Sequence, residues 1–166
     1  MPELPEVETV RRGLAELLPG RVVARVAVFD SPKSFPNARA DVEQFLYGAC
    51  VTAVRRRAKV LMIDLDTRYS LVIHLKMTGQ LVFRQWYSRA SSANNLGPGD
   101  KHAQIVTRDT TQIPDASNFA GGHPNDSLIG ELPDRSTRVQ IDFVDGSRLF
   151  FNDQRKFGWV KLLPTD

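Results

Sequence analysis

Near the start of the chain, apolar residues recur at the spacing of one helix face. Pro5 occupies a position that the first turn of a helix tolerates, and Glu6 and Glu8 stand close to the positive end of the helix dipole. A Pro-Gly pair at 19–20 ends the pattern. The sequence therefore predicts an amphipathic helix over residues 5–18. Its apolar face consists of Val7, Val10, Leu14, Leu17 and Leu18.

Beyond this helix the apolar pattern is mainly that of β-strands. Asp145-Gly146 separates two apolar runs, which is a strong hairpin signal, and another turn is expected near Thr78-Gly79. A short helix is expected around Asp41–Tyr47, closed by Gly48. Runs that are rich in valine or partly alternating occupy residues 21–30, 49–66, 69–76, 79–84, 138–151 and 158–163.

About eight strands and two helices follow from these patterns. Such a content favours an antiparallel sandwich or barrel over a doubly wound sheet. We expect a mainly β fold, an antiparallel β-sandwich flanked by an N-terminal helix and a second short helix.

Residues 83–137 have a different character from the rest of the chain. They are rich in Ser, Asn, Gly, Pro and Asp and include few apolar residues to bury. This composition predicts a long, loop-rich insertion, with a short strand expected only at 102–109. The whole chain, residues 1–166, has the length of one domain.

Composition and charge exclude some classes of protein. Only Cys50 is present and the three histidines are scattered, so neither a disulfide framework nor a clustered zinc site is expected in this chain. No apolar run approaches the roughly 20 residues of a membrane helix, and the acidic N-terminus is unlike a signal peptide, so we expect a cytosolic protein without membrane contact. A formal net charge of +3 mildly favours phosphate-rich partners.

The first residues could support nucleophilic chemistry. Removal of Met1 would leave Pro2 with a free secondary amine, and α-amino groups titrate at about pH 8, so a useful fraction is unprotonated at neutral pH. Such an amine can attack a sugar carbon and form an iminium. Glu3 could then donate a proton, and Glu6 could orient the amine or Glu3. Helix-start statistics alone favour a plainer interpretation, in which the prolines stiffen the chain and the glutamates match the helix dipole.

Four motifs, in order along the chain, carry a resemblance to a known family. They are PELPEVETVRRGL, RRRAKVLMIDL, IHLKMTGQL and NDQRKFGWVKL, beginning at residues 2, 55, 73 and 152. Together they resemble the bacterial formamidopyrimidine-DNA glycosylase family, also called Fpg or MutM, over residues 1–82 and 138–163. The resemblance implies an enzyme that flips an oxidised purine out of duplex DNA, displaces the base with its N-terminal proline and cleaves the strand by successive eliminations.

The resemblance also implies which residues are catalytic. Pro2 matches the nucleophile, Glu3 the proton donor and Glu6 a supporting acid of the same site. Lys59 matches the family lysine that grips phosphates beside the lesion. Without the family, the basic run that contains Arg57 and Lys59 could equally be a solvated face. DNA binding by Arg57 is favoured if one strand continues through Lys59, because alternate residues would then share a face.

Three further residues match those that fill the space left by a flipped base. They are Met77, Arg155 and Phe157. Met and Phe are apolar wedges, and Arg offers several donors to a cytosine edge. Taken singly, Met77 and Phe157 would more often be core residues. His74 resembles a motif histidine but is given no role.

Members of the family normally continue with a helix–two-turn–helix unit and a zinc finger that grips DNA. Neither is present in residues 1–166, so we expect zinc only in that C-terminal part and no cofactor in this chain. We expect a monomer that acts on damaged double-stranded DNA, and weak binding and excision by this chain alone. Two alternatives stay open: an endonuclease VIII-like glycosylase for oxidised pyrimidines, and a non-catalytic DNA-binding or protein-interaction module.

Overall fold

A computed structural model describes residues 3–29, 32–87, 113–114, 118–124 and 130–165. The helices are α1 (Leu4–Leu17), α2 (Arg39–Phe45) and the short 3-10 helix η1 (Pro32–Ser34). The strands are β1 (Val23–Val28), β2 (Val51–Arg57), β3 (Val60–Leu65), β4 (Tyr69–His74), β5 (Gly79–Arg84), β6 (Trp86–Tyr87), β7 (Ile113–Pro114), β8 (Phe119–Gly122), β9 (Thr137–Phe143), β10 (Arg148–Asp153) and β11 (Trp159–Pro164).

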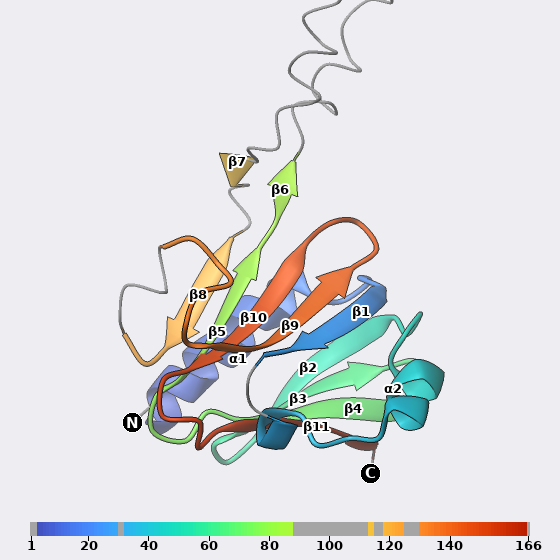
Figure 1. Ribbon diagram of the computed structural model, residues 1–166, viewed down its shortest axis with the longest axis horizontal. Helices are drawn as coiled ribbons and strands as arrows, with labels where there is room; N and C mark the ends of the chain where they lie inside the picture. The colour runs from blue at the N-terminus through green and yellow to red at the C-terminus, as the bar shows by residue number, and fades with distance from the viewer. Residues whose placement is uncertain (1–2, 30–31, 88–112, 115–117, 125–129, 166) are drawn as a thin grey trace, which may run out of the picture.

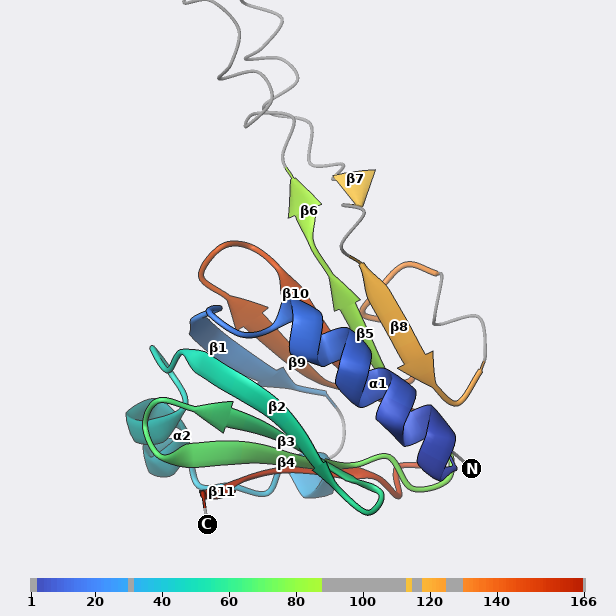
Figure 2. The same cartoon turned by 180° about the vertical axis from the view of Figure 1, so that it is seen from behind.

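Nine of the described strands form two antiparallel sheets. One sheet has the order β1-β9-β10-β5-β8 and the other has the order β11-β4-β3-β2, while β6 pairs only with β7. The two sheets lie one over the other (Figures 1 and 2). The prediction of a mainly β, sandwich-like fold with two α-helices is confirmed. So is the hairpin at Asp145-Gly146, where the Gly146 amide donates to the Phe143 carbonyl at 3.0 Å.

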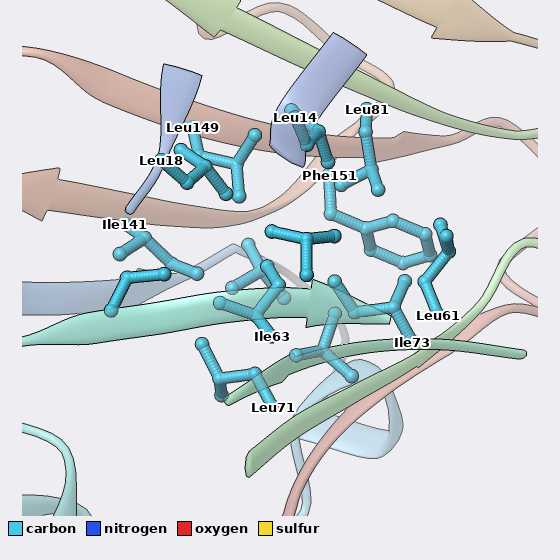
Figure 3. Close-up of a cluster of buried hydrophobic side chains, with 14 of the residues drawn as sticks. Leu14, Leu18, Leu61, Ile63, Leu71, Ile73, Leu81, Ile141, Leu149 and Phe151 are labelled. Carbon is cyan, nitrogen blue, oxygen red and sulfur yellow. The ribbon is translucent and has the colours of Figure 1, made fainter. Parts of the chain in front are cut away.

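The core fills the space between the sheets. Figure 3 shows Leu61, Ile63, Leu71 and Ile73 of the four-stranded sheet facing side chains of the other sheet and of α1. Inward residues alternate along β3, where positions 61, 63 and 65 are buried and the intervening positions are half-buried. Burying a side chain of this size contributes roughly 1.5–3 kcal/mol, so this layer fixes the relative position of the sheets.

Helix α1 bridges the two sheets, because it contacts β2 and β8, which are edge strands of different sheets (Figure 2). Val7, Val10 and Leu14 are buried, as the helical spacing predicts. Glu3 caps the helix: its side chain accepts from the backbone of Glu6, and the Glu6 carboxylate accepts from the Glu3 amide at 3.2 Å. This reciprocal cap fixes the chain entering the helix.

The loop-rich segment 83–137 contributes a strand that its composition does not predict. Residues 119–122 pair antiparallel with β5 and complete the five-stranded sheet. Phe119 packs against Gly13 of α1 so closely that a Cβ atom at Gly13 would stand 2.5 Å from its Cδ1 and 2.7 Å from its Cζ. The short strand expected at 102–109 lies outside the described residues.

The basic run does not form one continuous strand. β2 ends at Arg57, and Ala58 takes a left-handed conformation (φ 51°) in the turn before β3. The prediction that alternate residues share one face through Lys59 is therefore wrong, because the chain reverses there. Within the described residues, no helix combines the length and apolar content that crossing a bilayer requires.

Candidate functional site

Four chain segments meet at one end of the sandwich. They are the first turn of α1, the β2–β3 turn, the β4–β5 turn and the β10–β11 loop, and α2 lies at the opposite end in both views (Figures 1 and 2). These segments contain every described residue to which the sequence analysis gave a role, with Arg57 at the last position of β2. Pro2 lies outside the described residues, directly before Glu3.

Glu3 and Lys59 lie side by side at this end. The Lys59 ammonium is 3.4 Å from the Glu3 carboxylate, and the two side chains are 33% and 64% exposed. An exposed ion pair of this kind contributes little to stability, so both groups stay available to a ligand. The contact puts a cation suited to phosphate within reach of the acid that follows residue 2.

A second ion-pair network braces the same two segments. Arg56 of β2 donates to the Glu8 carboxylate of α1 at 2.8 Å and to the Ala58 carbonyl at 2.9 Å. It therefore ties the helix to the turn that presents Lys59. Hydrogen bonds from Arg11 and then Arg56 hold the pKa of Glu8 far below its usual range. Sequence reasoning missed this brace because it joins residues 48 positions apart.

Arg57 lies on the side of β2 that faces away from the core. It is exposed and lines a surface hollow together with Arg55, Val60 and Met62. The Arg55 guanidinium forms an ion pair with Asp64 on β3, at 2.5 Å. The role of Arg57 in DNA binding stays a prediction, separate from the Glu3–Lys59 pair.

Met77, Arg155 and Phe157 come from neighbouring loops and are exposed. Met77 follows the turn residue Lys76 and is 39% exposed, and Phe157 is 52% exposed, so neither is the core residue that its type alone would suggest. The Arg155 guanidinium carbon lies 5.0 Å from the centre of the Phe157 ring, within cation–π range. The exposed side chains of Met77, Arg155 and Phe157, which we call the projecting tips, thus lie at the same end of the molecule as Lys59.

His74 is the last residue of β4, paired with Val60 next to Lys59. Its Nδ1 accepts a hydrogen bond from the Lys76 amide at 3.1 Å, and its ring lies 5.8 Å from that of Trp159. Burial lowers the pKa of His74, and the charges of Lys76 and Lys59 lower it further. His74 thus lies beside two lysines, Lys59 and Lys76, at this end of the sandwich.

No group of three or more His, Cys, Asp or Glu side chains in the part of the chain that the structure describes could hold a metal ion. The zinc implied by the resemblance is expected in a C-terminal part, which these residues do not test. The described site instead combines carboxylates, cations and exposed apolar tips.

Comparison with known proteins shows which family the chain belongs to. A model of the formamidopyrimidine-DNA glycosylase N-terminal domain matches residues 1–160. The chain belongs to this family. A formamidopyrimidine-DNA glycosylase of Jannaschia sp. (strain CCS1) is 37% identical over 99% of the chain, and one of Chloroflexus aurantiacus is 34% identical over 98%. The chain spans only 46% and 43% of the length of these two relatives.

Solved structures of Lactococcus lactis Fpg share the fold. A complex of the wild-type protein with a DNA containing N7-benzyl-Fapy-dG matches with a TM-score of 0.66 and 21% identity, covering 99% of this chain and 45% of that one. A complex with a DNA containing an oxidized pyrimidine matches with a TM-score of 0.66 and 22% identity, over the same shares. At this identity the likeness extends to the fold, while membership of the glycosylase family rests on the sequence match.

Proposed function

We propose that residues 1–166 are the catalytic N-terminal domain of a bifunctional DNA glycosylase and AP lyase of base excision repair. Its substrates are oxidised purines in duplex DNA, 8-oxoguanine and formamidopyrimidines. The proposal rests on one observation above all: Glu3, adjacent to the proposed nucleophile, contacts Lys59. The β4–β5 turn and the β10–β11 loop, to which Met77, Arg155 and Phe157 belong, lie at the same end of the molecule (Figures 1 and 2). Family membership supports the same reaction class.

In this proposal the reaction begins at the Pro2 nitrogen, which is a secondary amine once Met1 is removed. The amine attacks the deoxyribose carbon that bears the damaged base, the bond to the base breaks with its electron pair leaving on the base, and the proton lost by the nitrogen neutralises the departing base. Glu3 supplies a proton to the sugar ring oxygen, which opens the ring and leaves an iminium between Pro2 and the sugar. The iminium then accepts electrons during elimination, so the strand breaks beside the damaged nucleotide.

Lys59 and the three projecting side chains hold the DNA for this reaction. Lys59 binds the phosphates next to the lesion, where an ammonium replaces released counterions. Met77 and Phe157 occupy the space vacated by the flipped base, and Arg155 offers donors to the opposite base. The Glu6 carboxylate accepts a hydrogen bond from the Glu3 amide and thereby supports Glu3 as the proton donor. Arg57 adds a contact to the DNA backbone.

The setting of the reaction is part of the proposal. We expect a cytosolic monomer acting on damaged double-stranded DNA, with zinc held by a C-terminal domain such as the family carries. Because the chain spans less than half of its curated relatives, residues 1–166 alone should lack many phosphate contacts and should bind and cleave DNA weakly.

The test is base release by the protein expressed from its complete reading frame. Duplexes contain 8-oxoguanine opposite cytosine or an oxidised pyrimidine, and Pro2→Gly is assayed beside the natural sequence. We expect faster release of 8-oxoguanine and no release by Pro2→Gly. Preference for the pyrimidine would indicate an endonuclease VIII-like enzyme. DNA binding without release of either base would indicate a non-catalytic module, and either result would overturn the proposal.

A further inference from the structure

Two buried side chains beneath the projecting tips join the β4–β5 turn to the β10–β11 loop. We propose that Thr78 and Asp153 are positioning residues, which hold Met77 on one segment at a fixed spacing from Arg155 and Phe157 on the other. The three tips would then enter DNA as one preformed unit. This inference rests on the proposed function, because it assigns the way in which the void-filling side chains of that same site are held.

The link consists of hydrogen bonds around the Asp153 carboxylate. The Thr78 hydroxyl donates to its Oδ1, the Arg155 amide donates to the same oxygen at 3.2 Å, and the Gly158 amide donates to Oδ2 at 2.5 Å. The Arg155 amide also lies 3.2 Å from the Thr78 hydroxyl oxygen. The Asp153 carboxylate therefore accepts hydrogen bonds from two amides of its own loop and from the hydroxyl of Thr78, which lies 75 positions earlier in the sequence.

Because Asp153 and Thr78 are buried, the loss of any one of these hydrogen bonds would cost free energy. Asp153 is fully buried and Thr78 is 9% exposed. A buried carboxylate that loses a donor pays a desolvation cost that its remaining bonds do not offset. Movement of one segment away from the other would break the Thr78 bond between two buried groups, so the two segments are expected to move together.

The surroundings of Asp153 restrict the segments further. A Cβ atom at Gly158 would stand 2.7 Å from the His74 carbonyl oxygen and 3.0 Å from Asp153 Oδ2, so the loop returns directly over the end of β4. One step deeper, the buried Asn152 amide donates to Gln80 at 3.0 Å, and these residues are partners in the β5–β10 ladder. A continuous layer of satisfied polar groups thus backs both segments.

The exposed side chains of Met77 and Phe157 stand on a buried, hydrogen-bonded layer, and this difference indicates what the layer does. Met77 and Phe157 are exposed, while Thr78, next to Met77, and Asp153, beneath the loop, are buried and hydrogen-bonded to each other. Flipping a nucleotide requires unstacking energy, and wedges that are already ordered lose less entropy when they insert. A loop that merely caps itself would need the Arg155 and Gly158 amides at Asp153, but it would not need Thr78.

Thr78 is therefore the residue to change. Thr78→Val keeps the shape and removes the hydroxyl, Thr78→Ser keeps the hydroxyl, and Thr52→Val is the matched control on the exposed part of β2. Thr78→Ala replaces the valine variant if valine unfolds the turn. All are made in the protein expressed from its complete reading frame.

Two measurements follow. Base release from an 8-oxoguanine duplex should slow by about 10- to 100-fold in Thr78→Val, because misplaced positioning groups cost rate on this scale. Cleavage at a preformed abasic site, where no base must be unstacked, should slow by only about threefold or less. Amide hydrogens of residues 154–158 should exchange faster in Thr78→Val than in the natural sequence, with Thr78→Ser and Thr52→Val unchanged in both measurements.

The inference is overturned if exchange at 154–158 is the same with and without the Thr78 hydroxyl, or if both reactions slow equally. If the natural sequence releases no base, the proposed function fails, and the exchange comparison still decides whether Thr78 couples the two segments.

Discussion

Gly13→Ala offers a sharp test of how the loop-rich segment is folded onto α1. In an ordinary helix interior this change stabilises by roughly 1 kcal/mol, because alanine has the higher helix propensity. Here the new Cβ would stand 2.5 Å from Cδ1 and 2.7 Å from Cζ of Phe119. The ring or the helix must shift, and overpacking of this kind costs about 1–3 kcal/mol.

The expected net effect therefore lies between about zero and a loss of about 2 kcal/mol, which corresponds to a fall in Tm of up to about 8 °C for a chain of this size. In a Phe119→Ala background the clash is absent, so the same change should raise Tm by about 2–4 °C relative to Phe119→Ala alone. The two substitutions should therefore be coupled by about 1 kcal/mol or more.

Thermal unfolding of the four proteins in this cycle, followed by circular dichroism, measures the coupling. If Gly13→Ala raises Tm by the same amount with and without Phe119, the ring does not pack on the helix. The assignment of residues 119–122 as a strand closing the sandwich beside α1 would then be refuted.

Three further predictions concern the charged groups of the site. Because the pKa of Glu8 is lowered in the folded protein, the contribution of Glu8 to stability is present above about pH 4.3 and is lost as the pH falls below that value. Glu8→Gln should therefore flatten the dependence of Tm on pH in this range. Parallel curves of Tm against pH for the variant and the natural sequence would contradict this. Arg56→Ala should lower Tm by about 2–4 °C because it removes a half-buried brace, whereas Arg12→Ala, 74% exposed on the same carboxylate, should change it little; equal losses would exclude the bracing role. Lys59→Ala should reduce the slope of DNA affinity against salt concentration by about one, and Arg39→Ala on α2 should leave the slope unchanged; an unaltered slope in Lys59→Ala would remove Lys59 from the phosphate contacts.

The features that the sequence predicts correctly are those that local chemistry determines. Proline near the start of α1, with apolar residues at helical spacing, suffices to place the helix, and Asp145-Gly146 suffices to place the β9–β10 hairpin. Lys59 and Met77 belong to motifs that are contiguous in the sequence, which is why the sequence alone could single them out as candidate site residues, a role that stays a prediction.

Other features depend on contacts between distant residues. Residues 119–122 have no alternating pattern, and they form a strand because β5 offers its edge and α1 offers the space at Gly13. Ala58 carries no turn signal, yet it takes a left-handed conformation that ends β2 before Lys59. Thr78 and Asp153 look like ordinary loop residues until the fold buries them against each other.

The central claim is that the amine of Pro2 forms a covalent bond with deoxyribose beside Glu3 and Lys59. Borohydride added during reaction with an abasic duplex reduces an iminium to an irreversible crosslink, and mass spectrometry of the digested adduct identifies the linked residue. We predict that the adduct lies on the nitrogen of Pro2, in protein that has lost Met1. An adduct on Lys59 or another lysine, with none on Pro2, would contradict the account.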